Sequence, residues 1–465
     1  MIQSANSVKD ELLQLDREHL FHPVISPNLH QEHGALVLKS AKGAYVTDID
    51  GHELLDGFSG LWCVNAGYGH ESVIKAATEQ LTTLPYATGY FHFSSEPTIR
   101  LAARLAELAP GDLNKVYFTL GGSDAVDSAI RLIRYYFNSL GKHSKKNIIA
   151  LEKGYHGSTS TGAGMTALPA FHDKFDLPLQ WQHHIPSPYP YRNGEGMTDQ
   201  QIIDKSVADL RAKVAELGGA DNVAAFFCEP VQGSGGVIVP PKGYLKAMRD
   251  ACKDMDMLFL ADEVITGFGR TGPMFACEAE DVAPDLLTCA KGLTSGYAPM
   301  GALMMTDAFY DVIADGAGNN PVGHGFTYSG HPLSASIAMA VLDLYTDGGL
   351  LENGKNVGAY FNDKLNALAE HPLVGEVRCA GMLAGVELVS DKANKTKPAK
   401  ALKVADKMYK EGYKNGLIFR AFADDVIGFA PPLCCTEADI DLLIDRFEKT
   451  LNAVMKQCGL THLVG

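Results

Sequence analysis

Short, unbroken apolar runs recur through the middle of the chain. Residues 257–261 and 286–290 are the clearest examples, and glycine follows each within a few positions. Runs of this kind are typical of strands buried on both faces of a parallel sheet. Further strands are predicted at residues 115–120, 147–151, 223–228 and 303–306.

Helical periodicity appears between these runs and after them. Val126, Ile130, Ile133 and Phe137 share one face of a predicted helix that Gly141 ends. Beyond Pro332 the pattern changes to a long helix and then to a mixed α/β segment. Strands of a small domain are predicted at residues 376–378, 383–388 and 417–420. The chain therefore has the pattern of an α/β protein, and 465 residues suffice for two domains.

The two clearest strands each deliver one ionisable residue, Asp262 and Lys291, at their carboxyl ends. Open α/β sheets bind ligands at this edge. A carboxylate and an amine placed there suit the two ends of a pyridoxal ring. Lys291 would bind the cofactor covalently, and Asp262 would keep the pyridine nitrogen protonated.

A glycine-rich turn at residues 121–124 joins a predicted strand to a predicted helix. The start of a helix attracts anions, because free N–H groups and the helix dipole point outward. We assign the cofactor phosphate to this turn, with Gly122 and Ser123 as its main contacts. A plain helix cap by Ser123 or Asp124 explains the same pattern equally well.

Residues 262–272 read D-E-V-I-T-G-F-G-R-T-G, and Lys291-Gly292 follows the next apolar run. This segment resembles the signature of the class III pyridoxal-phosphate aminotransferases, and most closely that of the ω-transaminases. The resemblance extends from about Leu20 to about Leu451. At residues 121–124 the chain departs from the family pattern, because Gly121 and Asp124 replace a hydroxyl or amide residue and a glutamate.

The resemblance implies a fold type I architecture with pyridoxal 5′-phosphate (PLP) as cofactor. It implies an N-terminal segment (1–61) that joins the small domain, a large PLP-binding domain (62–331) with a mostly parallel central sheet flanked by helices, and a C-terminal small α/β domain (332–465). It also implies a homodimer, or a tetramer built from it, with active sites shared between subunits.

The resemblance further implies roles for residues around the cofactor ring. Tyr155, followed by His156, is expected against one face of the ring, and Val264 against the other. Glu229 is assigned to the cofactor site because Pro230 cannot continue a central strand, which leaves Glu229 at the same sheet edge as Asp262.

Several aromatic and polar residues are expected around the substrate. The resemblance assigns Trp62, Tyr155, Phe326, Phe21 and Phe91 to the pocket, Thr327 to the neighbouring subunit's phosphate, and Arg420 to the substrate carboxylate. Three of these places have an ordinary alternative: Trp62 as a core residue, the aromatic segment 85–93 as core or dimer contact, and Arg420 as a surface side chain.

Composition and charge indicate which classes of binding partner and which location the protein has. The net charge of −15 argues against a nucleic-acid or anionic-membrane partner. No apolar run approaches the roughly 20 residues that span a bilayer. Nine scattered cysteines without a C-x-x-C motif, and no visible signal peptide, predict a reduced cytoplasmic protein. No metal is expected, since His19 and His22 beside a proline turn are ordinary.

These features predict a transaminase that moves an amino group from an amine or ω-amino acid to a keto acid, pyruvate, by a ping-pong mechanism. A decarboxylase, racemase or aminomutase of the same family remains an alternative, as does a non-catalytic regulator on this fold. Lys291 argues against the regulator. Diamines, β-alanine, taurine and arylalkylamines all remain open as donors.

Overall fold

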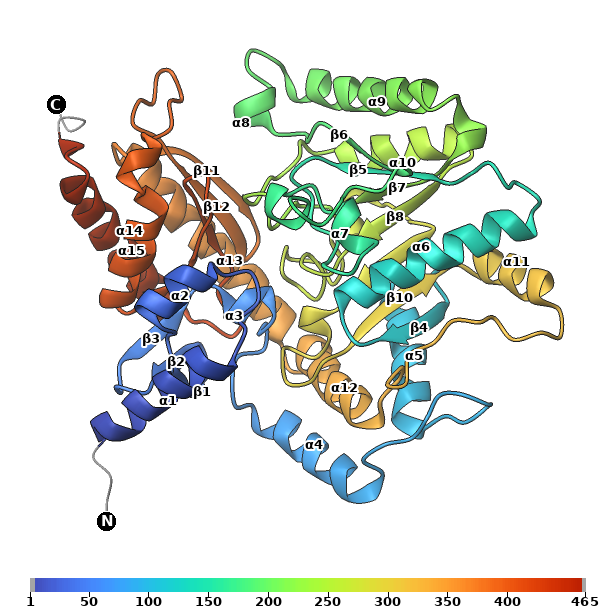
Figure 1. Ribbon diagram of the computed structural model, residues 1–465, viewed down its shortest axis with the longest axis horizontal. Helices are drawn as coiled ribbons and strands as arrows, with labels where there is room; N and C mark the ends of the chain where they lie inside the picture. The colour runs from blue at the N-terminus through green and yellow to red at the C-terminus, as the bar shows by residue number, and fades with distance from the viewer. Residues whose placement is uncertain (1–4, 462–465) are drawn as a thin grey trace.

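A seven-stranded sheet with the order β4-β10-β9-β8-β7-β5-β6 forms the centre of the larger half of the molecule (Figure 1). The computed structural model describes residues 5–461. Only β10 runs antiparallel to its neighbours, which confirms the predicted mostly parallel sheet. Its strands are β4 (Lys115–Thr119), β5 (Asn147–Leu151), β6 (Gln182–Ile185), β7 (Val223–Cys228), β8 (Leu258–Asp262), β9 (Leu286–Cys289) and β10 (Gly301–Met305).

Helices flank this sheet: α9 and α10 lie at the top of Figure 1, and α6 and α11 lie lower in the picture, near β10. The predicted apolar face of α6 is buried and packs against β4, β7, β9 and β10. These helices are α6 (Gly122–Ser139), α9 (Asp199–Glu216), α10 (Tyr244–Asp254) and α11 (Asp307–Ala317).

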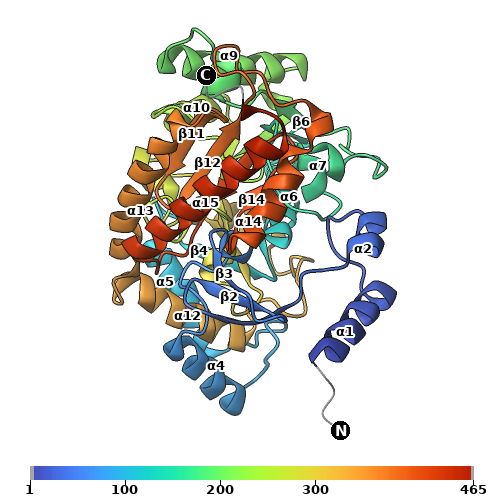
Figure 2. The same ribbon diagram turned by 90° about the vertical axis from the view of Figure 1, so that its left-hand side faces the viewer.

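A four-stranded antiparallel sheet, ordered β11-β12-β15-β14, forms the C-terminal part. Long helices pack beside it in the orange and red part of Figures 1 and 2. Its elements are β11 (Val374–Ala380), β12 (Leu383–Leu388), β14 (Arg420–Ala421), β15 (Val426–Phe429), α13 (Leu350–Ala367), α14 (Val404–Lys414) and α15 (Glu437–Gln457).

A third sheet, ordered β1-β2-β3-β13, connects the N-terminal segment to the C-terminal part. Strand β13 (Leu417–Ile418) pairs in parallel with β3 (Glu53–Asp56). The strand predicted at residues 417–420 is therefore divided. The buried Phe419 separates β13 from β14, so Arg420 begins a strand of a different sheet. The other two strands are β1 (Leu38–Lys42) and β2 (Tyr45–Asp48).

The remaining helices lie around these sheets. Helix α12 packs against α4 and α5, and α1 and α2 lie on the outside of the molecule (Figure 2). None of the helices within residues 5–461 is long and apolar enough to cross a membrane. The helices are α1 (Ala5–His19), α2 (Pro27–His33), α3 (Ser59–Trp62), α4 (Glu71–Thr83), α5 (Glu96–Leu108), α7 (Gly162–Met165), α8 (Pro190–Asn193) and α12 (Pro332–Thr346).

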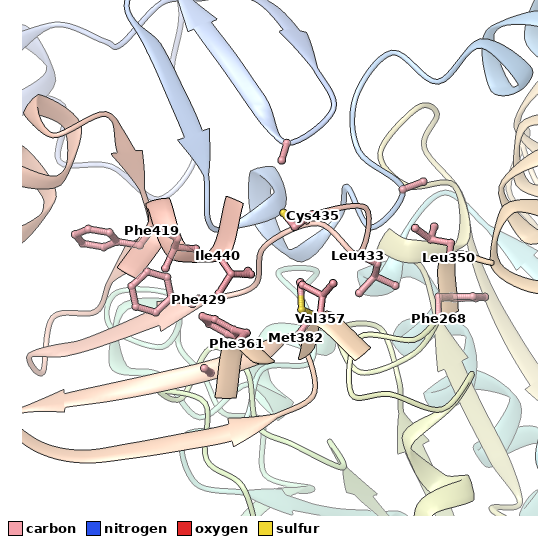
Figure 3. Close-up of a cluster of buried hydrophobic side chains, with 14 of the residues drawn as sticks. Phe268, Leu350, Val357, Phe361, Met382, Phe419, Phe429, Leu433, Cys435 and Ile440 are labelled. Atoms are coloured by element: carbon pink, nitrogen blue, oxygen red, sulfur yellow. The ribbon is translucent and has the colours of Figure 1, made fainter. Parts of the chain in front are cut away.

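One hydrophobic core runs through both halves of the molecule (Figure 3). Phe429 of β15 lies 5.6 Å from Phe419 and 6.3 Å from Phe361 between ring centroids. Aromatic pairs of this kind contribute about 0.5–1.5 kcal/mol each beyond the area they bury. Phe268, which follows β8, belongs to the same core. The two halves thus pack as one body, and the proposed boundary at residue 331 stays a prediction.

A fully buried arginine, Arg270, joins three parts of the chain. Its Nη1 donates to the carbonyls of Met382 (3.1 Å) and Pro431 (2.6 Å). Its Nη2 donates to Ser59 Oγ (3.2 Å) and Asn65 Oδ1 (2.7 Å). Burial lowers the pKa of this guanidinium to about 10. Four neutral acceptors thus replace the water that such a cation would otherwise bind.

We expect Arg270→Met to lower the free energy of unfolding by at least about 3 kcal/mol, because the substitution leaves four acceptors without their charged donor. Urea denaturation of the cofactor-saturated protein measures the change. Arg100→Met removes an exposed arginine that pairs with Glu96 on the same helix, and should cost less than about 1 kcal/mol. Equal losses in the two variants would contradict the role given to Arg270.

Candidate active site

Asp262 and Lys291 lie at the same edge of the central sheet, as predicted. Asp262 ends β8, and Lys291 follows the end of β9 by two residues. The Glu263 amide donates to the Thr288 carbonyl (2.9 Å), which continues the pairing of the two strands beyond Asp262. Lys291 opens a 3₁₀ turn (Lys291–Leu293) with a φ of 38°, so the chain leaves the sheet at the lysine itself.

The Asp262 carboxylate is buried, with 4% of its surface exposed. Its Oδ2 lies 2.7 Å from Nδ1 of His156, and its Oδ1 accepts from the Val264 amide at 3.2 Å. Burial opposes a charge on the imidazole, but the hydrogen bond and the charge of Asp262 raise the pKa of His156 above its usual value. The His156 ring therefore lies directly behind the carboxylate and fixes its orientation through this contact.

Glu229 fixes the backbone beside this pair. Its Oε1 accepts from the Tyr155 amide (2.8 Å) and its Oε2 from the Gly233 amide (3.0 Å). Burial, opposed by the charge of His156 and assisted by that of Asp262, raises the pKa of Glu229 to about 7. Glu229 thus holds the segment that carries Tyr155 and His156, and its assignment to direct cofactor contact stays a prediction.

The turn before α6 has the shape expected of a phosphate site. No side chain caps the start of α6, so the plain cap by Ser123 or Asp124 is not seen. A Cβ added to Gly122 would lie 2.9 Å from Cγ1 of Val264. Ser123 Oγ accepts from the Ser158 amide at 3.2 Å, which joins this turn to the segment after Tyr155. Uncapped amides without a covering side chain suit a bound anion.

Tyr155 lies half-buried next to this turn. Its hydroxyl is 3.0 Å from Ser158 Oγ, and its ring meets Phe171 edge-to-face at 5.4 Å. Val264 lies close to Gly122. The placement of Tyr155 and Val264 on opposite faces of the cofactor ring stays a prediction.

Two buried aromatic rings follow one another from Lys291. We call these residues, Trp62 and Phe422, the aromatic wall. The Lys291 Nζ lies 5.0 Å from the Trp62 ring centroid, and Trp62 stacks on Phe422 at 6.3 Å. The Arg420 guanidinium lies 5.6 Å from the Phe422 ring. Trp62 is thus both buried, at 3% exposure, and next to Lys291. Burial lowers the pKa of the Lys291 amine.

Phe422 was not found by sequence reasoning, although a signal existed. Residues two apart on a strand point to the same face, so an aromatic residue two positions after Arg420 could have been expected beside it. The contact of His156 with Asp262 was also not anticipated, because 106 residues separate the two.

Comparison with known proteins identifies the family. The sequence profile described as Aminotransferase class-III matches residues 27–451. The chain belongs to this family. It is a PLP-dependent aminotransferase of fold type I, which confirms the resemblance and the predicted cofactor.

Two curated relatives of this aminotransferase cover nearly its whole length. The putrescine–pyruvate aminotransferase of Pseudomonas aeruginosa is 40% identical over 452 residues, covering 97% of this chain and 98% of the relative. The diaminobutyrate–2-oxoglutarate transaminase of Halomonas elongata is 39% identical over 453 residues, covering 96% of each chain.

Solved structures agree with the sequence comparison. The ω-transaminase of Pseudomonas jessenii in complex with PMP superposes with a TM-score of 0.94 at 36% identity, covering 97% of this chain and 99% of the other. The PMP-bound aminotransferase of Vibrio fluvialis gives a TM-score of 0.92 at 34% identity, covering 95% and 97%.

The residues of this aminotransferase fit PLP. The buried Asp262 is suited to a protonated ring nitrogen, and the amine of Lys291 stands at the same sheet edge. The uncapped turn at Gly122 offers amides to a phosphate. Holding the cofactor would therefore fall to Asp262, Lys291 and the turn before α6.

Four predicted site residues lie apart from this cluster in the single chain. Phe21 and Phe91 are more than 80% exposed, Thr327 is exposed, and Phe326 is half-buried against His324 at 5.4 Å between ring centroids. The structure places none of them in contact with Lys291 or Asp262 among the residues it describes.

We expect Lys291→Ala to abolish turnover, because the predicted role of this residue is to form the covalent link to the cofactor and to carry the proton. The visible absorbance of the lysine-bound cofactor should disappear, while cofactor released by denaturation is still detected. Lys115→Ala, on the same sheet but partly exposed, should keep both properties. Multiple turnovers by the Lys291→Ala variant would exclude Lys291 as the covalent lysine.

Proposed function

We propose that this aminotransferase transfers an amino group from an amine or ω-amino acid to pyruvate, forming alanine and an aldehyde or ketone. The observation that carries the proposal is the series Lys291, Trp62, Phe422 and Arg420, with successive separations of 5.0, 6.3 and 5.6 Å. It supports a pocket with a reactive amine at one end, an apolar side, and a guanidinium at the other end.

Arg420 has no ion-pair partner among residues 5–461, which supports its proposed role of binding the substrate carboxylate. Its side chain is exposed, and within residues 5–461 no carboxylate pairs with it. Arginine binds carboxylates through two parallel hydrogen bonds. Both oxygens of Glu229 accept backbone amides, which argues against Glu229 as an alternative partner. When a neutral donor occupies the pocket, Arg420 would turn toward solvent.

The chain's own groups would then carry out the proton transfers. PLP, when bound, supplies an electron sink for the bond that is broken at the donor carbon. Lys291 Nζ removes the proton from that carbon, and its lowered pKa increases the fraction of neutral amine available as a base. Asp262, oriented by His156, would keep a proton on the ring nitrogen. The second half-reaction reverses these steps with pyruvate.

The identity of the amino acceptor is a separate part of the proposal. The relative named putrescine–pyruvate aminotransferase supports pyruvate, whereas the relative named diaminobutyrate–2-oxoglutarate transaminase favours a dicarboxylate acceptor. One guanidinium, that of Arg420, lies beside the aromatic wall, which matches the single carboxylate of pyruvate. 2-Oxoglutarate would need a second cation for its other carboxylate.

Arg420→Ala should damage the two half-reactions unequally. The step with pyruvate should lose about 2–5 kcal/mol of transition-state binding, by analogy with breaking a desolvated charge pair. The step with a neutral arylalkylamine should change little and serves as the internal control. Stopped-flow absorbance of each half-reaction separates them. Equal losses in both steps would assign Arg420 to the fold or the cofactor.

We propose further that the active unit is a homodimer with shared sites. The segment 85–93 and the segment 324–331 pack together, since the Tyr86 hydroxyl donates to the Thr327 carbonyl (2.9 Å) and Tyr86 lies 5.9 Å from Tyr328. The loop between α4 and α5 extends away from the body of the molecule (Figure 1). Exposed aromatic residues on these segments support burial by a second subunit.

In such a dimer, the residues that lie apart from the site in one chain would complete the site of the other. Thr327 would bind the neighbour's phosphate, and Phe326 and Phe91 would line its pocket. Phe21, at the start of the turn after α1, would lie at the pocket mouth. A cytoplasmic location is proposed as well, and it is supported by nine cysteines that are all free.

Phe91→Asp should dissociate the dimer and remove activity with it, because a carboxylate would be buried in the interface. Analytical ultracentrifugation and cofactor retention are measured on the same samples. Leu140→Asp, an exposed apolar residue after α6, should leave both unchanged. A fully active monomer would refute the shared site.

A further inference from the structure

Three metal-ligating side chains meet where α1, the following turn and α2 come together. Nε2 of His22 lies 2.7 Å from Asp16 Oδ1, and Nε2 of His30 lies 3.1 Å from Asp16 Oδ2. One ligand atom from each of the three residues lies within 4.8 Å of the other two. Helices α1 and α2 lie side by side in Figures 1 and 2. Both histidines therefore face one carboxylate.

The deepest member of the cluster, His30, makes no well-aligned hydrogen bond, although its Nε2 lies 3.1 Å from Asp16 Oδ2. Only 5% of the surface of His30 is exposed, and neither ring nitrogen makes a hydrogen bond with any described residue. Asp16 Oδ2 is also buried without a hydrogen bond. Buried polar groups are normally satisfied, so an unsatisfied imidazole aimed at an unsatisfied carboxylate oxygen needs an explanation. A simple Asp16–His22 pair leaves His30 with only this misaligned ion-pair contact to Asp16.

A divalent metal ion would satisfy these atoms together. Two neutral imidazoles and one carboxylate are a common ligand set for zinc, with bonds of about 2.0–2.2 Å to nitrogen and oxygen. Small side-chain rotations would bring the three ligand atoms to such distances. His22 is a quarter exposed, so water can reach the fourth position.

We propose that Asp16, His22 and His30 bind one divalent cation of the zinc class. The ion joins α1 to α2 and so fixes the turn between them. Phe21, immediately before His22, is held in place by the same connection. The site is separate from amino transfer, so it stands or falls independently of the proposed substrates. It also revises the expectation that the chain uses no metal.

The test uses the full-length, PLP-loaded protein after treatment with a chelator and removal of the chelator. Zinc is titrated in competition with a chromogenic chelator. The wild type should bind one zinc per chain, and His30→Ala and His22→Ala should each weaken binding at least about 100-fold, since even the loss of a residue that only supports a ligand costs 10–100-fold. His33→Ala, an exposed histidine on α2, should bind as the wild type does.

Two further measurements distinguish the loss of a metal ligand from the loss of local structure. Zinc should protect the first 35 residues of the wild type from limited proteolysis. Cobalt(II) should give the visible bands of nitrogen and oxygen ligands. A wild type that binds zinc no more tightly than His30→Ala would overturn the proposal. Thiolate-to-cobalt absorption in the wild type would overturn it too, because the metal would then be on cysteine.

Discussion

The structure depends on keeping a carboxylate and an amine at one buried sheet edge. Asp262 ends β8 and Lys291 lies two residues after the end of β9, where the surrounding protein excludes most of the water that would stabilise their charges. Their neighbours compensate for this loss. His156 contacts the Asp262 carboxylate at 2.7 Å, and Glu229 holds the backbone that positions His156 through two amide hydrogen bonds.

A second buried charge, Arg270, extends this arrangement to the rest of the chain. It follows Asp262 by eight residues and binds Ser59, the first residue of α3, whose last residue is Trp62. The same guanidinium binds the carbonyls of Met382 and Pro431 from the C-terminal part. Arg270 therefore connects the sheet edge, the aromatic wall over Lys291 and the part of the chain that carries Arg420.

Much of the fold could be predicted from apolar runs, because strands β7 to β10 are buried on both faces and contain few polar residues. Strand β6 was not predicted, since Gln182 and two histidines interrupt its apolar pattern at the sheet edge. The change of sheet at Phe419 was also missed, because it depends on tertiary packing. Asp16, His22 and His30 match no spacing motif, and only the packing of α1 on α2 brings them together.

The most direct test of amino transfer to pyruvate is a donor panel read as alanine. Nitrogen-15-labelled diamines, β-alanine, taurine and arylalkylamines are each incubated with pyruvate and the PLP-loaded enzyme, with Lys291→Ala as the blank. The account predicts labelled alanine in amounts equal to the aldehyde or ketone formed from at least one donor. Labelled glutamate with 2-oxoglutarate but no alanine with pyruvate, or carbon dioxide without amino transfer, would contradict it.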